Sequence, residues 1–343
     1  MGASGVIHER FLVTGAFGCL GAWVVSELVR EGTEVVTFDL AADDFRLRYL
    51  LADSDLLALT KIRGDVTDSE AVQNAMTEHR ITNVVHLAGL QTPVCAADPS
   101  WGARVNVVGT VNVFAAVKKT AAAGRPIAYA SSVAVYTANQ TDDVRGAESF
   151  GPPGSHYGVY KLANENTARV FAAENDVASV GLRPYVVYGV GRDRGMTSAP
   201  TAAMLAAARG EPSVITFSGK CQMQYAQDVA RAFIAATRSD CGGCAILNLD
   251  APSVDIVDVV AAIHQACPDI RAPGISVSGE PLPFPARLPD NGVRELLGRT
   301  AVTSLEDGVG QTIDRFKQLI SSGRIAEKSD CDRKEGLLGV TAR

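Results

Sequence analysis

The sequence predicts an α/β fold built on a doubly wound parallel sheet, and two observations lead to that prediction. Short apolar runs alternate along the chain with longer segments of helical periodicity, and the runs are apolar on both of their faces. Strands buried on both faces are typical of parallel sheets, in which helices form the right-handed crossover connections.

The first half of the chain supplies these elements in alternation. An apolar run at 11–15 precedes a helical pattern from Cys19 to Arg30, in which Leu20, Val24 and Leu28 share one stripe. Further strand signals lie at 34–39, 60–65, 82–89 and 126–132, with helical segments near 69–79 and 100–123 between them.

The second half of the chain is expected to be mainly helical. Helical patterns are expected at 157–175, 198–209, 227–238, 253–266 and 304–320, and strands at 177–188 and 245–250. The Pro-rich segment 273–290 reads as surface loops with one strand at most. We expect a first domain over 8–184, to which 227–250 returns, a smaller discontinuous C-terminal cap from 185–226 and 251–321, and a loose tail at 322–343.

Composition excludes several functional classes. The 343 residues include 32 Lys and Arg against 38 Asp and Glu, a net charge of −6, which argues against nucleic-acid or anionic-membrane partners. No stretch approaches the ~20 apolar residues of a membrane span and no secretory h-region is present, so we expect a cytoplasmic protein. Cys241 and Cys244 form the only CxxC pair and only His264 is near, so we expect no metal site.

A glycine-rich turn joins the first strand to the first helix. In the run from Thr14 to Gly21, Gly15 permits the tight turn, Gly18 lets the backbone approach a pyrophosphate, and Gly21 lets the helix pack closely on the strand. The helix N-terminus then offers N–H groups and partial positive charge to phosphates. This context predicts a Rossmann-type dinucleotide-binding domain.

Asp39 ends the next strand, 18 residues after Gly21. A carboxylate there accepts hydrogen bonds from the ribose hydroxyls of an adenosine and repels a 2′-phosphate. Arg46 and Arg48 lie further along the chain, so NAD is favoured over NADP.

A Ser–Tyr–Lys set predicts alcohol–ketone chemistry. Tyr157 and Lys161 are four residues apart on an expected helix, so both can face one pocket. A nearby ammonium is expected to lower the pKa of Tyr157, whose phenolate takes the proton of a secondary alcohol as hydride leaves the carbon. Ser132, at the end of the fifth strand, is expected to hydrogen-bond the same oxygen.

These motifs together resemble the extended short-chain dehydrogenase/reductases, the NAD-dependent epimerase/dehydratase family. The similarity runs from about Phe11 to about Leu319 and includes GDVTD at 64–68, HLAG at 86–89, YASSVAVY at 129–136 and LRPYVVYG at 182–189. It implies a homodimer that pairs the helices 100–123 and 157–175. Asn106 resembles the family's helix Asn near the cofactor, with capping or bracing of a strand end as the alternative role.

The resemblance also implies the cofactor-contacting residues. Asp65 and Val66 are expected to flank the adenine, and Pro184 and Tyr185 to lie near the nicotinamide. Many relatives have Lys where Gln91 stands. The residues expected around NAD are Gly15, Phe17, Gly18, Cys19, Leu20, Gly21, Asp39, Asp65, Val66, Leu87, Ala88, Gly89, Gln91, Asn106, Tyr157, Lys161, Pro184 and Tyr185.

Departures from the family pattern narrow the reaction. Sugar 4,6-dehydratases carry an Asp–Glu pair where this chain has Val133 and Ala134, which cannot move protons. Nucleotide-sugar 4-epimerases usually hold the diphosphate with an Asn and an Arg. Val186 stands at the Asn position, and Cys221 or Gln222 at the Arg position, which argues against a nucleotide diphosphate, with Arg287 as one candidate substitute anchor.

The segment 189–200 is instead similar to a loop of uronate dehydrogenases. Arg194, or Arg192 as a second candidate, is expected to clamp a carboxylate, with a solvated loop charge as the alternative for each. The residues expected around the substrate are Gln91, Ser132, Val133, Tyr157, Arg192 and Arg194.

The leading functional prediction is an NAD-dependent dehydrogenase of a small polyhydroxylated substrate, such as a sugar or sugar acid. The alternative is an NAD-dependent sugar or nucleotide-sugar epimerase with a transient keto intermediate. A non-catalytic NAD-binding sensor is less favoured, because proteins of that kind usually lose the Tyr or the Lys.

Overall fold

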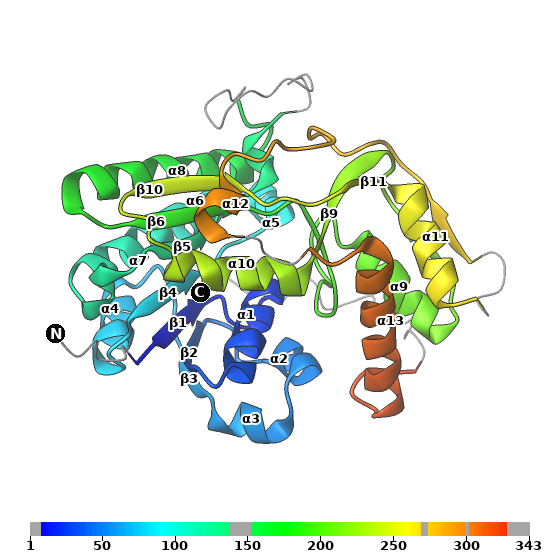
Figure 1. The fold of residues 1–343 in the computed structure, drawn as a ribbon, viewed down its shortest axis with the longest axis horizontal. Coiled ribbons are helices and arrows are strands. Elements are labelled where there is room, and N and C mark those ends of the chain that lie inside the picture. The colour runs from blue at the N-terminus through cyan, green and yellow to red at the C-terminus, as the bar shows by residue number, and fades with distance from the viewer. Residues whose placement is uncertain (1–7, 138–151, 269–273, 299–301, 328–343) are drawn as a thin grey trace.

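The computed structural model describes residues 8–137, 152–268, 274–298 and 302–327. They form a larger sheet-containing part and a smaller part that carries the last helices (Figure 1). The expected tail at 322–343 lies outside the described residues from 328 onward. No described helix combines the length and apolarity needed to cross a bilayer.

A seven-stranded, wholly parallel sheet forms the larger part. Its strand order is β10-β6-β5-β4-β1-β2-β3. The order reverses between β1 and β4, and such a switch point opens a crevice at the carboxyl ends of the strands. The strands are β1 (Arg10–Thr14), β2 (Glu34–Asp39), β3 (Thr60–Arg63), β4 (Asn83–His86), β5 (Ile127–Ala130), β6 (Ser179–Arg183) and β10 (Cys244–Asn248).

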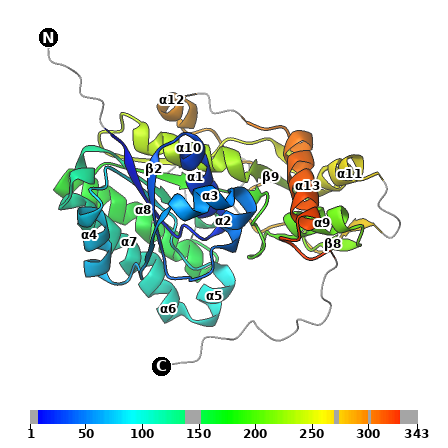
Figure 2. The same cartoon turned by 90° about the horizontal axis from the view of Figure 1, so that it is seen from below.

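Helices cover both faces of this sheet (Figure 2). Side chains alternate along β1, so Phe11 and Val13 enter one buried cluster with Phe233 of α10, while Leu12 enters the other with Phe114 of α7. The helices of this part are α1 (Cys19–Arg30), α2 (Phe45–Leu50), α3 (Asp53–Ala58), α4 (Ser69–Glu78), α5 (Thr92–Ala97), α6 (Pro99–Ala103), α7 (Gly109–Lys118), α8 (His156–Asn175) and α10 (Ala226–Arg238). The sequence patterns did not indicate α2, α3 or α5.

The expected helix 100–123 is interrupted. A π-helical turn at Arg104–Val108 separates α6 from α7, and a 3-10 turn at Ala121–Gly124 follows. A π turn is an i→i+5 insertion that often marks a functional site, and hydrophobic periodicity does not reveal it. The turn holds Asn106, one of the predicted site residues.

The expected strand 177–188 is two strands in two sheets. Pro184 lies after β6, and β7 (Val186–Tyr188) joins β9 (Lys220–Tyr225) instead of continuing the large sheet. Proline lacks the N–H that a ladder requires, so the chain leaves the first sheet here. The crossing places Tyr185 at the junction of the two parts.

The smaller part contains two small sheets and several helices. β9 pairs with β7 in parallel and with β11 (Ser253–Asp255) antiparallel, and β8 (Ser213–Ile215) pairs with β12 (Ile275–Val277). The segment 253–266, expected to be wholly helical, therefore begins as a strand. The helices of this part are α9 (Ala199–Arg209), α11 (Ile256–Ala266) and α13 (Leu305–Ser321), whereas α12 (Val293–Leu297) packs against α10 of the larger part (Figure 1).

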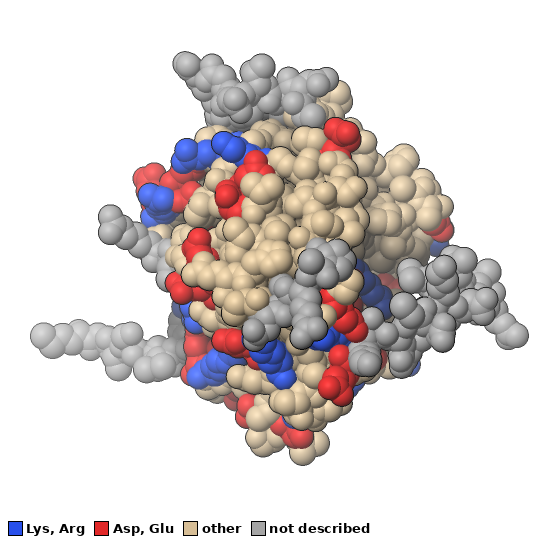
Figure 3. Space-filling model, turned by 90° about the vertical axis from the view of Figure 1, so that its right-hand side faces the viewer, with Lys and Arg blue, Asp and Glu red and all other residues tan. Residues whose placement is uncertain are grey.

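The outer face on the α11 and α13 side is shown in Figure 3. Described acidic and basic side chains are interspersed there among large uncharged areas, and the described residues form no broad basic patch on this face.

Candidate active site

A cleft opens at the carboxyl ends of β1, β4, β5 and β6. The residues that line it come from the glycine-rich turn, the ends of these strands, the start of α8 and two loops of the smaller part. They are Gly15, Gly18, Cys19, Leu20, Gly21, Leu87, Gly89, Leu90, Gln91, Thr92, Ala130, Ser131, Ser132, Val133, Ala134, Tyr157, Lys161, Pro184, Tyr185, Val187, Arg192, Gly195, Met196, Thr197 and Phe284.

The glycine-rich turn is fitted to a phosphate group. Gly15 has φ +67°, and a Cβ there would lie 2.6 Å from the Ala88 nitrogen. A Cβ on Gly21 would lie 2.1 Å from the Gly15 oxygen, so both positions require glycine. Gly18 is the N-cap of α1 without a capping side chain, and the first turn holds no acid. The helix therefore presents N–H groups to the cleft that suit the pyrophosphate of a dinucleotide.

Asp39 joins the end of β2 to that turn. Its Oδ2 accepts a hydrogen bond from the Phe17 nitrogen at 2.8 Å, and its Oδ1 accepts one from the Ala41 nitrogen at 2.9 Å. Each carboxylate oxygen retains a lone pair for a further donor, such as a ribose hydroxyl.

Arg46 lies near this turn and already has hydrogen-bond and ion-pair partners. Its guanidinium donates to the Phe17 and Gly191 carbonyls and pairs with Asp193 at 2.7 Å. Arg48 pairs with Asp43 at 2.7 Å and also contacts Asp44. Because both cations already have partners, neither is available as a free cradle for a 2′-phosphate.

The predicted adenine side is held from the neighbouring helix. Asp65 accepts the Thr67 N–H at 2.8 Å, Val66 is buried, and Asn112 of α7 donates to the Val66 carbonyl at 2.9 Å. These residues do not line the cleft. Ala88 also lies behind the lining, against Gly15.

Asn106 braces the loop after β4. Its Nδ2 donates to the carbonyls of Leu90 at 3.2 Å and Gly102 at 3.0 Å, which is the bracing role weighed from the sequence. Its Oδ1 is buried without a partner among the described residues, and a Cβ on Gly89 would lie 2.7 Å from it. A contact with the cofactor remains a prediction.

Ser132, Tyr157 and Lys161 meet in the cleft. Ser132 starts a 3-10 turn after β5, its hydroxyl accepts the Ala134 N–H at 3.1 Å, and its side chain acts to lower the pKa of the neighbouring Tyr157. The Lys161 Nζ donates to the Ala130 carbonyl at 2.7 Å and lies 5.5 Å from the centre of the Tyr157 ring. The expected convergence of the three residues is thus present.

The expected effect of Lys161 on the phenol is corrected by the structure. Burial raises the pKa of Tyr157 above its ordinary value, while the hydrogen bond from Ser132 and the charge of Arg192 lower it. Burial also lowers the pKa of Lys161 to about 8, because the charged ammonium loses solvation. Desolvation is therefore the largest influence on the pKa of Tyr157 and sets its direction.

The two candidate arginines lie in different places. Arg192 lines the cleft, donates to Thr197 Oγ1 at 3.1 Å, and has a buried Nε without a partner among the described residues. Arg194 does not line the cleft: its side chain is 77% exposed and its ion pair with Asp193 spans 3.8 Å. The loop that carries both arginines turns at Gly191 and Gly195, which have φ of +88° and +99°.

The two positions that hold diphosphate in many 4-epimerases are buried structural positions here. Val186 is fully buried in β7. The Gln222 amide donates to the Ala251 carbonyl at 2.7 Å and accepts the Leu288 N–H at 3.0 Å, and Cys221 is also buried.

Sequence reasoning missed part of the lining. Phe284, Met196 and Thr197 line the cleft together with the predicted Gln91 and Val133. Met196 and Thr197 lie within the predicted loop 189–200, so their proximity to the candidate arginines could have indicated them. Phe284 lies in the segment expected to be surface loops, and no pattern in the sequence points to it.

Comparison with known proteins decides the family. The sequence model described as "NAD dependent epimerase/dehydratase family" matches residues 11–248. The chain belongs to this family. It is therefore an NAD-dependent enzyme of the extended short-chain dehydrogenase/reductase type, and the expected α/β fold and cofactor are confirmed.

Individual members of the family align over most of the chain. A UDP-glucose 4-epimerase of Mycolicibacterium smegmatis is 26% identical over 324 residues, covering 90% of this chain and 98% of that one. The structure of MoeE5 in complex with UDP-glucuronic acid and NAD is 27% identical with a TM-score of 0.74, covering 90% and 99%. A GalE-like L-threonine dehydrogenase from Cupriavidus necator, at 21% identity and TM-score 0.73 over 89% and 99%, shares the fold.

Proposed function

We propose that this family member oxidises a secondary alcohol of a small sugar acid, or reduces the corresponding ketone, with NAD. The observation that carries the proposal is the meeting of Ser132, Tyr157 and Lys161 with Arg192 in one cleft beside the glycine-rich turn. NAD supplies the hydride acceptor, and NADH the donor in the reverse direction.

The side chains have distinct proposed roles. Tyr157 takes the hydroxyl proton of the alcohol as its C–H bond breaks, and returns that proton to the ketone oxygen in reduction. Ser132, which lines the cleft with Tyr157, orients the same oxygen. Lys161 is held by the Ala130 carbonyl beside the tyrosine ring, and its proposed role is to offset, as an ammonium, part of the burial that raises the pKa of Tyr157.

Arg192 is proposed to bind the substrate carboxylate. A buried guanidinium nitrogen without a partner carries a desolvation cost that an anionic ligand would offset. Among the described lining residues, Arg192 and Lys161 are the only Lys or Arg, and Lys161 already donates to Ala130. The relative that was solved with UDP-glucuronic acid makes a uronic acid a natural first choice of substrate.

Epimerisation is the second candidate. It is favoured by the alignment with the M. smegmatis UDP-glucose 4-epimerase over 98% of that enzyme. In that case the hydride returns to the opposite face of the same ketone, and no NADH accumulates.

One experiment separates the candidates. The protein is incubated with NAD and a panel of uronates, aldonates, aldoses and nucleotide sugars, with NADH followed by absorbance and isomerisation by NMR. NADH accumulation with an acid supports the dehydrogenase. Isomerisation without NADH supports the epimerase, and NAD binding without either reaction supports a sensor.

The role of Arg192 has its own test in the same panel. Arg192→Met is expected to raise KM for acids by about a hundredfold, because a charge-assisted bidentate contact is lost, while KM for neutral substrates changes little. Arg194→Met serves as the control because that side chain is exposed. Equal effects of both variants would contradict the assignment.

A further inference from the structure

The segment 281–291, here called the strap, crosses from the smaller part of the molecule to the large sheet. It begins near β12, where Pro281 bridges to Ser218, and ends before α12. Figure 1 shows it as the orange trace that leads into α12. The sequence predicted a surface loop, but Leu288 and Pro285 are buried.

Hydrogen bonds from four neighbouring elements fasten the strap. The first half is held by the Tyr185 hydroxyl, which donates to the Pro285 carbonyl at 2.9 Å, and by Ser253 Oγ, which donates to the Ala286 carbonyl at 2.8 Å. Tyr185 lies at the β6–β7 junction and Ser253 on β11. The first half of the strap is therefore held by two separate parts of the chain, the β6–β7 junction and β11.

The second half is held equally well. Gln222 of β9 accepts the Leu288 N–H, and Asn248 of β10 donates to the Pro289 carbonyl at 3.0 Å. Asn291 in turn donates to the Ile246 carbonyl at 2.8 Å. A segment with this many side-chain anchors behaves as a fixed wall, because each bond restricts its backbone.

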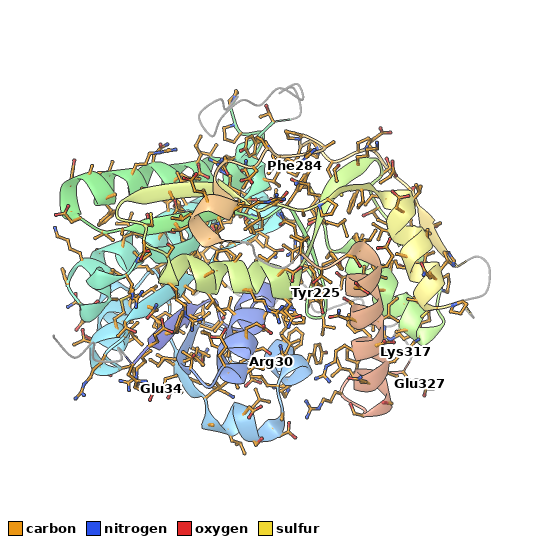
Figure 4. The ribbon with its side chains drawn as sticks, in the orientation of Figure 1. Arg30, Glu34, Tyr225, Phe284, Lys317 and Glu327 are labelled. Carbon is orange, nitrogen blue, oxygen red and sulfur yellow. The ribbon has the colours of Figure 1, made fainter. Side chains whose placement is uncertain are left out.

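Phe284 is the residue that the strap presents to the cleft. It lines the cleft, and its ring meets the Tyr185 ring edge-on with 6.0 Å between centroids. In Figure 4 Phe284 lies between the large sheet and the smaller part, next to the strap's crossing. Tyr185 thus holds two adjacent residues of the strap. Its hydroxyl donates a hydrogen bond to the Pro285 carbonyl, and its ring packs against the ring of Phe284.

The hydrogen bonds that hold the strap also leave Gln222 unable to bind a substrate diphosphate. Gln222 is fully buried, and its amide is used to bind the strap and Ala251. It therefore offers no contact to a diphosphate, and Arg192 is the one arginine among the described residues that line the cleft. A buried diphosphate needs charge-assisted partners for its several oxygens, and one guanidinium cannot serve both a diphosphate and a carboxylate.

We infer that the strap closes the substrate end of the cleft, that Phe284 is the specificity-determining residue of this wall, and that the substrate is a free sugar acid rather than its nucleotide conjugate. The inference rests on the proposed function. It adds an upper limit to the size of the substrate and names Phe284 as the residue that sets this limit.

The test compares free and conjugated acids on the intact protein. Glucuronate and UDP-glucuronate are titrated into NAD-loaded protein by calorimetry, and NADH is followed for both, together with sugar acids of four to seven carbons and a disaccharide acid. We expect UDP-glucuronate to bind at least a hundredfold more weakly than the best free acid. UDP-glucuronate binding as tightly as the free acids would overturn the role of the strap.

Substitution of Phe284 locates the size limit. Phe284→Ala is expected to raise kcat/KM for the largest acids relative to the smallest by about tenfold, since discrimination of a few carbon atoms in an apolar pocket is of that order. Phe171→Ala, a partly buried phenylalanine of α8 outside the cleft, is the matched control and should leave the ratio unchanged. An unchanged ratio in Phe284→Ala would also overturn the inference.

The failure of the two proposals can be told apart. NADH formation from UDP-glucuronate with no preference for free acids would overturn the size limit and leave the hydride chemistry in place. Absence of turnover and of binding for every acid would reject the proposed function and the size limit with it.

Discussion

Arg183 of β6 and Glu165 of α8 form a bidentate ion pair in which both side chains are fully buried. The Nε and one terminal nitrogen of Arg183 each donate to a different Glu165 oxygen at 2.7 Å. Ser131 Oγ also donates to Glu165. The pair lies one turn beyond Lys161 on the same helix, so it fixes the register between α8 and the end of β5, where Ser132 stands.

Breaking this pair should destabilise the protein. Glu165→Gln leaves the Arg183 charge buried against a neutral partner, and loss of one member of a buried pair typically costs about 3–5 kcal/mol. Urea unfolding at pH 7 measures the change in unfolding free energy. Glu174→Gln, the same substitution at an exposed position of α8, should change it by less than about 0.5 kcal/mol. A similar small change for both variants would show that the pair contributes little.

His86 gives the fold an acid sensitivity. Its ring is buried between Thr14 at 2.7 Å and Thr110 at 3.0 Å, and burial lowers its pKa to about 3, with the charge of Lys161 acting in the same direction. The unfolded chain, with an ordinary His pKa near 6.5, then binds a proton that the folded protein does not.

Stability should therefore fall as the pH drops from 7 to 5, by about 2 kcal/mol from this residue alone. The comparison of urea unfolding free energies at these two pH values for the wild type and His86→Gln isolates it. Between pH 7 and pH 5 the unfolding free energy of the variant is expected to fall by less than that of the wild type, whatever its value at pH 7. Parallel losses in both proteins would assign the acid sensitivity to other groups.

Asp39 should decide between NAD and NADP. Its carboxylate is held by the Phe17 N–H, and the nearby Arg46 is paired with Asp193. Asp39→Ala is expected to weaken NAD binding by about tenfold or more, since contacts to the ribose hydroxyls are lost, and to narrow the preference over NADP. Fluorescence titrations with both cofactors provide the measurement. An unchanged preference would remove Asp39 from the adenosine site.

Local patterns were sufficient for the cofactor side of the fold. The helix from Cys19 to Arg30 and the strand ending at Asp39 have the predicted bounds, because glycine spacing and apolar periodicity are properties of neighbouring residues. The same reasoning predicted one strand across Pro184, although the proline itself was a signal that the ladder had to end there.

The substrate side depended on information that is not local. Arg192 and Arg194 are two residues apart and indistinguishable in sequence, and only the folded structure shows that Arg192 lines the cleft while Arg194 is exposed. The pKa of Tyr157 depends on burial by residues from several elements, so the i,i+4 spacing to Lys161 gave the wrong direction. Phe284 reaches the cleft through anchors more than 30 residues away in sequence, such as Ser253.

We propose that Tyr157 moves the proton of the reacting alcohol, and the substitution Tyr157→Phe is the most direct test of that role. The variant keeps the ring beside Lys161 and removes only the hydroxyl. With the best substrate of the panel, we expect kcat to fall by at least about a thousandfold while the Kd for NAD changes less than about threefold. A variant that retains most of its turnover with normal NAD binding would contradict it.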